Sequence, residues 1–129
     1  MSITRDIKIL LAGIESNIFV GAGNLPDQPD SAILISGTGG YNPEDTHDGS
    51  TYGNPTFQVW LRNEAKRGGY DSGRARCEAI VSILHLISNQ YVNGTRYLII
   101  RQMGDILEMG PDKKRRQEFS MNFVAQVGR

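Results

Sequence analysis

The chain has 129 residues, a length typical of one domain built around a single two-layer core. Its 14 Lys and Arg residues balance its 14 Asp and Glu residues, so no net charge attracts it to nucleic acid or to an anionic membrane. The single cysteine, Cys77, excludes an internal disulfide. The apolar stretch Ile7–Ile14 is too short and too charged for a signal peptide, and no run reaches membrane-spanning length. We therefore expect a soluble protein made in a reducing cytoplasm.

The first part of the chain predicts one short helix and two short strands. Apolar residues at helical spacing indicate an amphipathic helix over Ser2–Ala12, which ends at Gly13. Asn17–Val20 predicts a brief strand. Ser31–Ser36 predicts a second strand, which has no clear polar face and is expected to be buried on both sides.

Residues Gly37–Asn54 predict a long loop, because they are rich in glycine and show no apolar periodicity. A loop of this length in a small domain is usually functional or disordered. The glycines of Gly37–Gly40 are not followed by a helix, which argues against a phosphate-binding loop. Asp45, His47 and Asp48 could bind a metal, but a solvated acidic loop is the simpler interpretation.

Pro55–Arg62 predicts a half-buried strand that leads into the only long helix of the chain. In the strand, Phe57, Val59 and Leu61 alternate with polar or amphipathic residues on the other face. The helix is predicted over Asp71–Asn89, with Asp71 or Ser72 as its N-cap.

Along the same helix, Glu78 opposes Arg74. The apolar stripe of the helix includes Cys77 and is widened by Ile83 and Leu86, so we expect it to lie across a sheet.

The C-terminal part predicts further strands joined by turns. Asn93–Gly94 indicates a turn, Arg96–Met103 an apolar strand, and Gly104–Asp105 a second turn before a short return strand at Ile106–Met109. Gln117–Val127 alternates over eleven residues and is the clearest strand. The predicted fold is α+β: one domain over residues 1–129, with a mostly antiparallel sheet of about five or six strands, a long helix packed across it and a short N-terminal helix.

No pattern in the sequence indicates catalysis, a metal site or a cofactor site, so we do not expect an enzyme. We find no ordered Ser, His and Asp set and no carboxylate pair isolated among apolar residues. Cys77 and His85, both on the long helix, are interpreted as packing residues.

The surfaces left uncovered by one helix are the candidate contact sites. The polar side of Pro55–Arg62 is neither fully polar nor fully apolar, which favours cover by another subunit or by the N-terminal helix. The basic run at residues 113–116 could be a solvated hairpin end, a partner contact or, with lower weight, a contact to nucleic-acid phosphates. The candidate interface residues are Tyr41, Tyr52, Gln58, Trp60, Arg62, Lys113, Lys114, Arg115 and Arg116.

Several strings, taken in order, resemble the phage minor capsid and tail-terminator group, small proteins that close the head-proximal end of a long tail tube. They are Leu25–Asp30 before Ala32–Ser36, then Gly39–Gly40, Phe57–Arg62 and the helix after it, Gly110–Lys113, and Arg116–Phe123. The likeness covers most of residues 15–127. Its strings are patterns of strand and turn rather than a chemical signature.

The resemblance implies a structural virion protein in the tail neck, assembled in the host cytoplasm, with no cofactor and no membrane contact. Its expected partners are copies of itself in a ring, typically a hexamer, the tail tube protein and a head connector or completion protein. DNA would pass through the ring without specific binding. Two alternatives stay open: a head-completion or head–tail adaptor protein, and a small nucleic-acid-binding domain that uses Lys113–Arg116.

Overall fold

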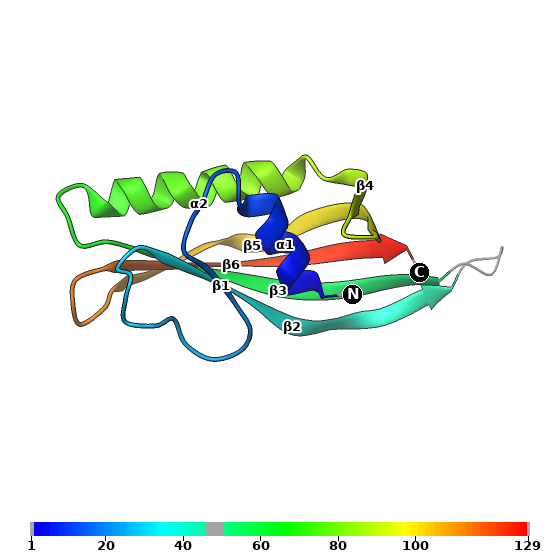
Figure 1. The fold of residues 1–129 in the computed structure, drawn as a ribbon, viewed down its shortest axis with the longest axis horizontal. Coiled ribbons are helices and arrows are strands. Elements are labelled where there is room, and N and C mark those ends of the chain that lie inside the picture. The colour runs from blue at the N-terminus through cyan, green and yellow to red at the C-terminus, as the bar shows by residue number, and fades with distance from the viewer. Residues whose placement is uncertain (1, 46–50, 129) are drawn as a thin grey trace.

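The computed structural model describes residues 2–45 and 51–128. They form a mixed α+β fold with one curled six-stranded sheet and two helices (Figure 1). The elements are α1 (Ile3–Leu11), β1 (Ile18–Val20), β2 (Ala32–Asp45), β3 (Thr51–Asn63), α2 (Gly69–His85), β4 (Ser88–Val92), β5 (Thr95–Pro111) and β6 (Gln117–Gly128). Neither described helix is long and apolar enough to cross a membrane.

The strands are ordered β1-β2-β3-β6-β5-β4 across the sheet. Four of the five neighbouring pairs are antiparallel, and only β1 and β2 run parallel. The two helices lie on the same side of the sheet (Figure 1). The opposite side, which we call the open face, has no helix over it among the described residues.

The hydrophobic core lies between the helices and the sheet. Phe57, Val59 and Leu61 of β3 are fully buried there, as the alternation of this strand predicted. The odd-numbered residues of β6 from Phe119 to Val127 face the same core. Cys77, Ile80 and Leu84 of α2 complete it from above.

The N-terminal helix α1 is fixed to the sheet by a buried polar contact. The Tyr97 hydroxyl of β5 donates a hydrogen bond to Asp6 Oδ2 at 2.5 Å, and both residues are buried. Ile7 and Leu11 of the same helix are part of the core. Arg76 of α2 forms an ion pair with Glu15, just after the helix. The helix is thus part of the domain rather than an appendage.

The predicted loop at Gly37–Asn54 is wrong over most of its length. Its first part continues β2 to Asp45, and its last part opens β3 at Thr51. The pairing has register shifts between Gly37 and Gly40 and between Tyr41 and Glu44, which hide the two-residue alternation. Gly40 is required at its bulge because a Cβ there would stand 2.6 Å from the Asn54 carbonyl oxygen. His47 and Asp48, considered above as metal ligands, lie outside the described residues.

The predicted turn at Gly104–Asp105 is also wrong. Residues 95–111 form the single strand β5, and the glycine sits in an irregularity between Met103 and Leu107. Gly104 has φ +77°, which a bulge can accommodate without reversing the chain. A glycine followed by an aspartate resembles a turn signal, so the sequence pattern predicted two strands where the structure has one.

The long helix begins and ends earlier than predicted. It starts after Gly68, which has φ +75°, and neither Asp71 nor Ser72 is the N-cap. It ends at His85, because residues 88–92 form the edge strand β4. The predicted packing role is wrong for the exposed His85 and for Leu86, which is 77% exposed. Cys77 is buried as predicted, and Arg74 pairs with Glu78 at 3.4 Å.

Candidate assembly interface

At one end of the molecule, the connection between β1 and β2 crosses the open face and is held there by Arg62. This arginine is on β3, and its guanidinium donates hydrogen bonds to the backbone carbonyl oxygens of Asp30 from Nε, at 2.9 Å, and of Pro26 and Pro29 from Nη2, both at 2.7 Å. Arg62 is only 4% exposed. Its charge lies beneath the connection, where it satisfies carbonyl groups that would otherwise lack a partner.

Arg116, in the turn between β5 and β6, binds the same connection. Its guanidinium pairs with Asp112 at 2.7 Å and with Asp27 and Asp30, both at 3.2 Å. It also donates a hydrogen bond to the Asp27 carbonyl oxygen at 2.6 Å. Lys114 adds an ion pair with the Asp27 carboxylate at 2.5 Å. We call this set of contacts between residues 26–30, Arg62 and residues 112–116 the arginine clamp.

Charges in the clamp shift the pKa values of its acids. A hydrogen bond from Lys114 lowers the pKa of Asp27, with help from Arg116. Burial favours the protonated form of Asp112, but hydrogen bonds from the Arg116 side chain and from the Arg116 and Lys114 backbone outweigh it, so the pKa of Asp112 is lowered. Both carboxylates are therefore ionised at neutral pH, as the ion pairs require.

The turn that carries Lys113 and Arg115 is held by hydrogen bonds to Asp112. Asp112 Oδ1 accepts hydrogen bonds from the backbone amides of Lys114 and Arg116, both at 2.9 Å. Arg115 has φ +64°, a left-handed conformation that glycine or asparagine would adopt more easily. The side chains of Lys113 and Arg115 are exposed at this tip.

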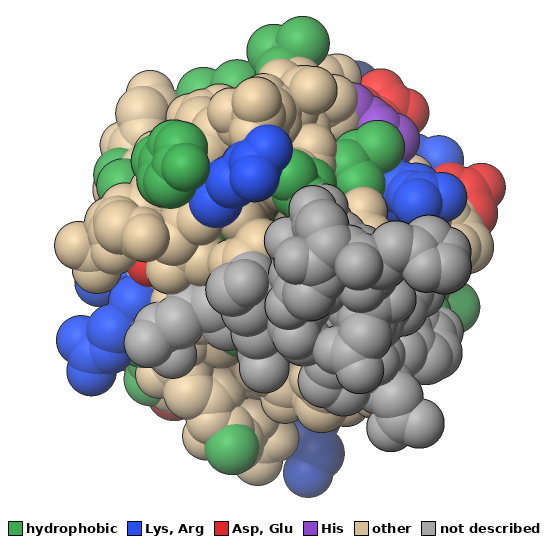
Figure 2. Space-filling view, turned by 90° about the vertical axis from the view of Figure 1, so that its right-hand side faces the viewer, with side chains coloured by type: hydrophobic (Ala, Val, Ile, Leu, Met, Phe, Trp, Pro, Cys, Tyr) green, Lys and Arg blue, Asp and Glu red, His purple; other side chains and the backbone are tan. Residues whose placement is uncertain are grey.

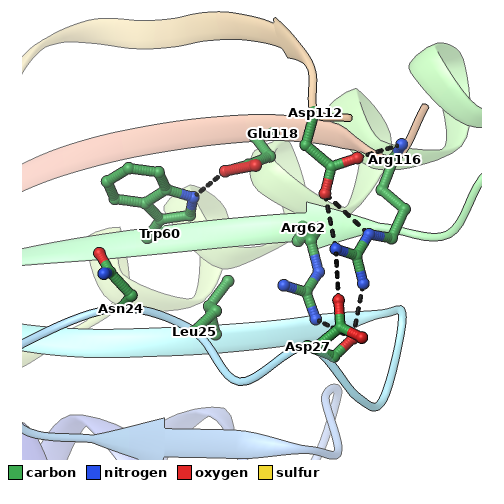
Figure 3. Close-up of a pocket in the computed structure, with 8 residues that line it drawn as sticks. All are labelled: Asn24, Leu25, Asp27, Trp60, Arg62, Asp112, Arg116 and Glu118. Atoms are coloured by element: carbon green, nitrogen blue, oxygen red, sulfur yellow. Dashed lines mark hydrogen bonds and ion pairs between the residues drawn. The ribbon is translucent and has the colours of Figure 1, made fainter. Parts of the chain in front are cut away.

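Beside the clamp, a hollow of about 310 Å³ opens on the open face (Figure 3). The Trp60 indole forms one wall and donates a hydrogen bond to Glu118 Oε2 at 2.7 Å. The two arginines and Asp112 lie at the other end. The residues around it are Asn24, Leu25, Asp27, Trp60, Arg62, Asp112, Arg116 and Glu118. Its lining is partly polar and partly apolar.

Away from the clamp, the open face is partly apolar. Leu107 of β5 pairs with Ser120 and is 58% exposed, and Ile99 and Met109 of the same strand are also exposed. Gln58 and Trp60 are half-buried. Seen from the end of the molecule opposite the clamp, hydrophobic side chains reach the surface in separate patches (Figure 2). Scattered exposure of this kind is common, but a row along one strand is suited to association.

The structure separates the predicted contact residues into distinct groups. Arg62 and Arg116 are buried within this chain, because both guanidinium groups lie against backbone carbonyls and carboxylates. Lys114 is exposed but tied to Asp27. Lys113, Arg115, Gln58 and Trp60 stay at the surface, fully or in part. Tyr41 lies in β2 and Tyr52 in β3, on the paired arm that leads to residues 46–50.

Sequence reasoning missed the acidic half of the clamp. Asp27 and Asp30 were noted only within a string that resembles a family, and their partners Lys114 and Arg116 lie more than 80 residues away along the chain. The available signal was opposite charge in two predicted turns: Leu25–Asp30 contains two aspartates, and Lys113–Arg116 contains four cations. Nothing in either string alone indicates that the two turns meet.

The described residues offer little basis for catalysis. They contain no group of three or more His, Cys, Asp or Glu side chains placed to hold a metal ion. Burial raises the pKa of the Cys77 thiol to about 12, so this thiol is not poised as a nucleophile.

Comparison with known proteins identifies the family of this chain. The model of a family described as bacteriophage tail terminator protein matches residues 11–129. A search of curated proteins finds no significant match. Among solved structures, a chain from the virion of a native gene transfer agent particle is similar over 94% of this chain and 85% of that chain, with a TM-score of 0.61 and 13% identity. At that identity the similarity concerns the fold alone. The match to nearly the whole sequence shows that this chain belongs to the bacteriophage tail terminator protein family.

Proposed function

We propose that this protein is a structural component of the virion that forms a ring on the head-proximal end of the tail tube. The ring, a hexamer, stops polymerisation of the tube and presents a surface to the head connector. Residues 1–129 act as a single tail-terminator domain. The protein is made in the host cytoplasm and resides in the neck region of the tail, where DNA passes through the ring without specific binding.

The observation that carries this proposal is the family match over residues 11–129, because it includes both strings of the arginine clamp and every strand of the sheet. The similarity to a chain from a virion supports the fold on which the proposal depends. A terminator must offer different surfaces to its own copies, to the tube and to the head. This sheet has an open face with exposed Leu107 and Met109 and a basic tip at Lys113 and Arg115, which are chemically distinct surfaces.

We further propose that the protein acts by assembly and not by catalysis. The clamp binds its own chain, since the Arg62 and Arg116 guanidinium groups are occupied by internal carbonyls and carboxylates. A catalytic arginine needs donors directed at a substrate. The arrangement instead stabilises two turns and the surface that they form.

The proposal is tested in lysates that contain the tail tube protein but no capsids. A tagged copy of this protein should capture the tube protein from such lysates, and tubes assembled without it should grow beyond their normal length. Retention of capsid connectors alone, with tubes of normal length in its absence, would contradict the proposal.

A head–tail adaptor is the second candidate. Partner choice separates the two functions, since an adaptor should bind capsids that lack tails. A nucleic-acid-binding role has less support than the basic run suggested, because Arg116 and Lys114 already pair with aspartates. If the protein bound DNA through the remaining cations, binding should weaken steeply with salt.

A further inference from the structure

The sheet is narrower at one end, where β5 is an edge strand. β4 pairs with β5 only between Thr95 and Ile99, and β5 continues past it to Pro111 (Figure 1). Over residues 101–111, β5 therefore has β6 as its single neighbour among the described strands. At the level of β1 the sheet has five strands, and its two edges are β1 and the free part of β5.

A single row of paired residues runs from one of these edges to the other. In strand order its members are Phe19, Leu34, Trp60, Ser120 and Leu107. Paired residues on neighbouring strands lie side by side, and their side chains point to the same face of the sheet, here the open face. Phe19 is 36% exposed and Leu107 is 58% exposed. The row thus has an exposed apolar side chain at each end, at the same level along the strands.

The surface beside β1 adds a free positive charge to its apolar end of the row. A hollow of about 380 Å³ opens where α1 meets β1, and Lys8, Ala12 and Phe19 are among the residues that line it. Lys8 is exposed, and no carboxylate of the described residues pairs with it. The acid in the hollow, Glu15, is already paired with Arg76. We call Lys8, Phe19 and this hollow the β1 flank.

The surface beside the free part of β5 carries an excess of negative charge. Three carboxylates share Arg74 there: Glu108 at 3.1 Å, Glu78 at 3.4 Å and Asp105 at 3.9 Å. Asp105 has the longest of these contacts, and its side chain is 87% exposed. It precedes Leu107 by two residues on the same strand, and we call these two residues the β5 flank. The two flanks are alike in their apolar side chains and opposite in charge, so they are complementary.

The free edge of β5 is protected against the addition of another strand. Its pairing with β6 has register shifts between Met103 and Leu107 and between Glu108 and Gly110. Gly104 and Gly110 adopt the left-handed conformation, with φ +77° and φ +82°. Bulges of this kind twist an edge away from further pairing. A contact through exposed side chains is therefore expected on this flank, and not an extension of the sheet.

We propose that the β1 flank of one copy packs against the β5 flank of the next, with the partner's Leu107 against Phe19 and the partner's Asp105 paired with Lys8. The proposal rests on the ring proposed above, because a ring of identical copies needs two different, complementary surfaces on each copy. Rotation about the ring axis keeps every residue at its height along that axis. With the strands along the axis, the two ends of one row therefore meet in neighbouring copies.

Charge reversal tests this contact, because the two flanks carry opposite signs. Lys8→Glu places two like charges at every joint, and so does Asp105→Lys, so each variant alone should need at least about tenfold more protein for half-maximal ring formation. An equimolar mixture of the two variants should form rings at nearly the native concentration. In a hexamer the two variants can alternate, and each joint then has one positive and one negative side chain. Native mass measurement follows the rings, alone and on tail tubes.

Lys113→Glu is the matched control, because it makes the same change of charge at an exposed position elsewhere. Alone it should leave ring formation unchanged, and mixed with Asp105→Lys it should give no rescue. Lys8 and Asp105 are exposed, so the thermal transition of the monomer should change little in either variant. Normal rings from Lys8→Glu alone, or a mixture of the two flank variants no better than either one, would overturn the contact.

Cysteine cross-linking tests the level at which the copies meet. In the double variant Phe19→Cys with Leu107→Cys, oxidation should link copies into a ladder that ends at the size of the ring. Links within one copy are excluded, because four strand spacings place the two positions about 19 Å apart, whereas a disulfide joins Cα atoms less than about 7 Å apart. The native Cys77 is buried and should not take part.

The matched control is Phe19→Cys with Ile99→Cys. Ile99 is also exposed and lies on the same strand, but it pairs with Gln126, six residues along β6 from Ser120. A ladder from the Leu107 pair and not from the Ile99 pair is the expected result. Equal ladders from both pairs, or none from the Leu107 pair in a sample whose mass shows intact rings, would overturn the contact and leave the ring proposal standing. If no ring forms alone or on tail tubes, both proposals fail.

Discussion

The two faces of β3 differ in what they bind. One face presents Phe57, Val59 and Leu61, which are fully buried beneath the helices. The other presents Gln58 and Trp60, both half-buried, and Arg62, which is buried under a connection of the same chain. The first face accounts for the stability of the monomer through the burial of apolar area. The second is covered at one end by the arginine clamp and is open at the other, and we propose that its open part contacts partners.

The comparison predicts different consequences for mutations on the two faces. Changes on the helix-covered face should unfold the protein. Changes in the clamp should lower stability by an intermediate amount, and changes on the open face should affect assembly without unfolding the monomer.

The largest effect is expected for Leu84→Asp. Leu84 is fully buried against the sheet, and an unpaired charge there costs about 3–5 kcal/mol, a large part of a total stability of about 5–15 kcal/mol. We expect loss of soluble, folded protein, measured by yield and circular dichroism. The control Leu86→Asp, two residues later and 77% exposed, should fold normally. A folded Leu84→Asp protein would contradict the assignment of the covered face.

A smaller loss of stability is expected for Arg62→Met. The substitution keeps much of the side-chain volume but leaves the carbonyl groups of Pro26, Pro29 and Asp30 without their donor. We expect destabilisation by about 2 kcal/mol, measured by urea unfolding. Lys113→Met, at the exposed tip of the neighbouring turn, is the control and should change stability by less than about 0.5 kcal/mol. Equal effects of the two variants would show that the clamp contributes nothing to stability.

Loss of the buried hydrogen bond between Tyr97 and Asp6 should lower the free energy of unfolding by a similar or slightly smaller amount than Arg62→Met does. Tyr97→Phe removes the hydroxyl that donates to the buried Asp6 carboxylate, and leaving that group without its donor costs about 1–3 kcal/mol. Thermal unfolding measures the loss. Tyr91→Phe removes an exposed hydroxyl and should have no measurable effect on the monomer. A Tyr97→Phe protein as stable as the native one would mean that α1 is held by its apolar residues alone.

The clamp should also give a specific dependence on acid. The pKa values of Asp27 and Asp112 are lowered in the folded protein, so the unfolded chain binds protons first as the pH falls. Their stabilising contribution is complete above the ordinary aspartate pKa of 3.8 and is lost as the pH falls through the lower folded values. Urea unfolding between about pH 5 and pH 2.5 should therefore show a smaller drop in stability for Asp112→Asn than for the native protein. Identical pH profiles would contradict the pairing.

The smallest effect on stability is expected at the basic tip. Lys113→Glu with Arg115→Glu changes two exposed side chains and should leave the monomer folded, as circular dichroism would show. Attachment of the protein to tail tubes or heads should fall if the tip contacts an acidic partner. If virions assemble in normal number with this variant, the tip is a solvated turn without a partner contact.

The sequence was most informative where side chains alternate against the core. The strands at residues 57–61 and 117–127 were predicted correctly because an apolar residue recurs at every second position and is buried. It was least informative where backbone pairing with bulges determines the structure. In β2 beyond Ser36 and in β5 around Gly104, glycines maintain strand pairing that side-chain patterns do not reveal.

The clamp was beyond prediction from local patterns for a different reason. A buried arginine such as Arg62 is stable only because carbonyl groups from a distant turn surround it, and no local pattern indicates that turn. The helix end was missed because Leu86 and Ile87 extend the apolar spacing past His85, although the chain turns there into an edge strand. The strings that resemble the family include residues from both halves of the clamp, but they do not indicate that the two turns meet.

The mass and shape of the assembled protein on tail tubes test the proposed ring most directly. Native mass measurement, combined with negative-stain imaging of tubes incubated with the purified protein, would show both the copy number and the place of binding. We predict a closed six-fold ring at one end of each tube, after which the tube no longer grows. A protein that stays monomeric in the presence of tubes, while the tubes continue to lengthen, would contradict the account.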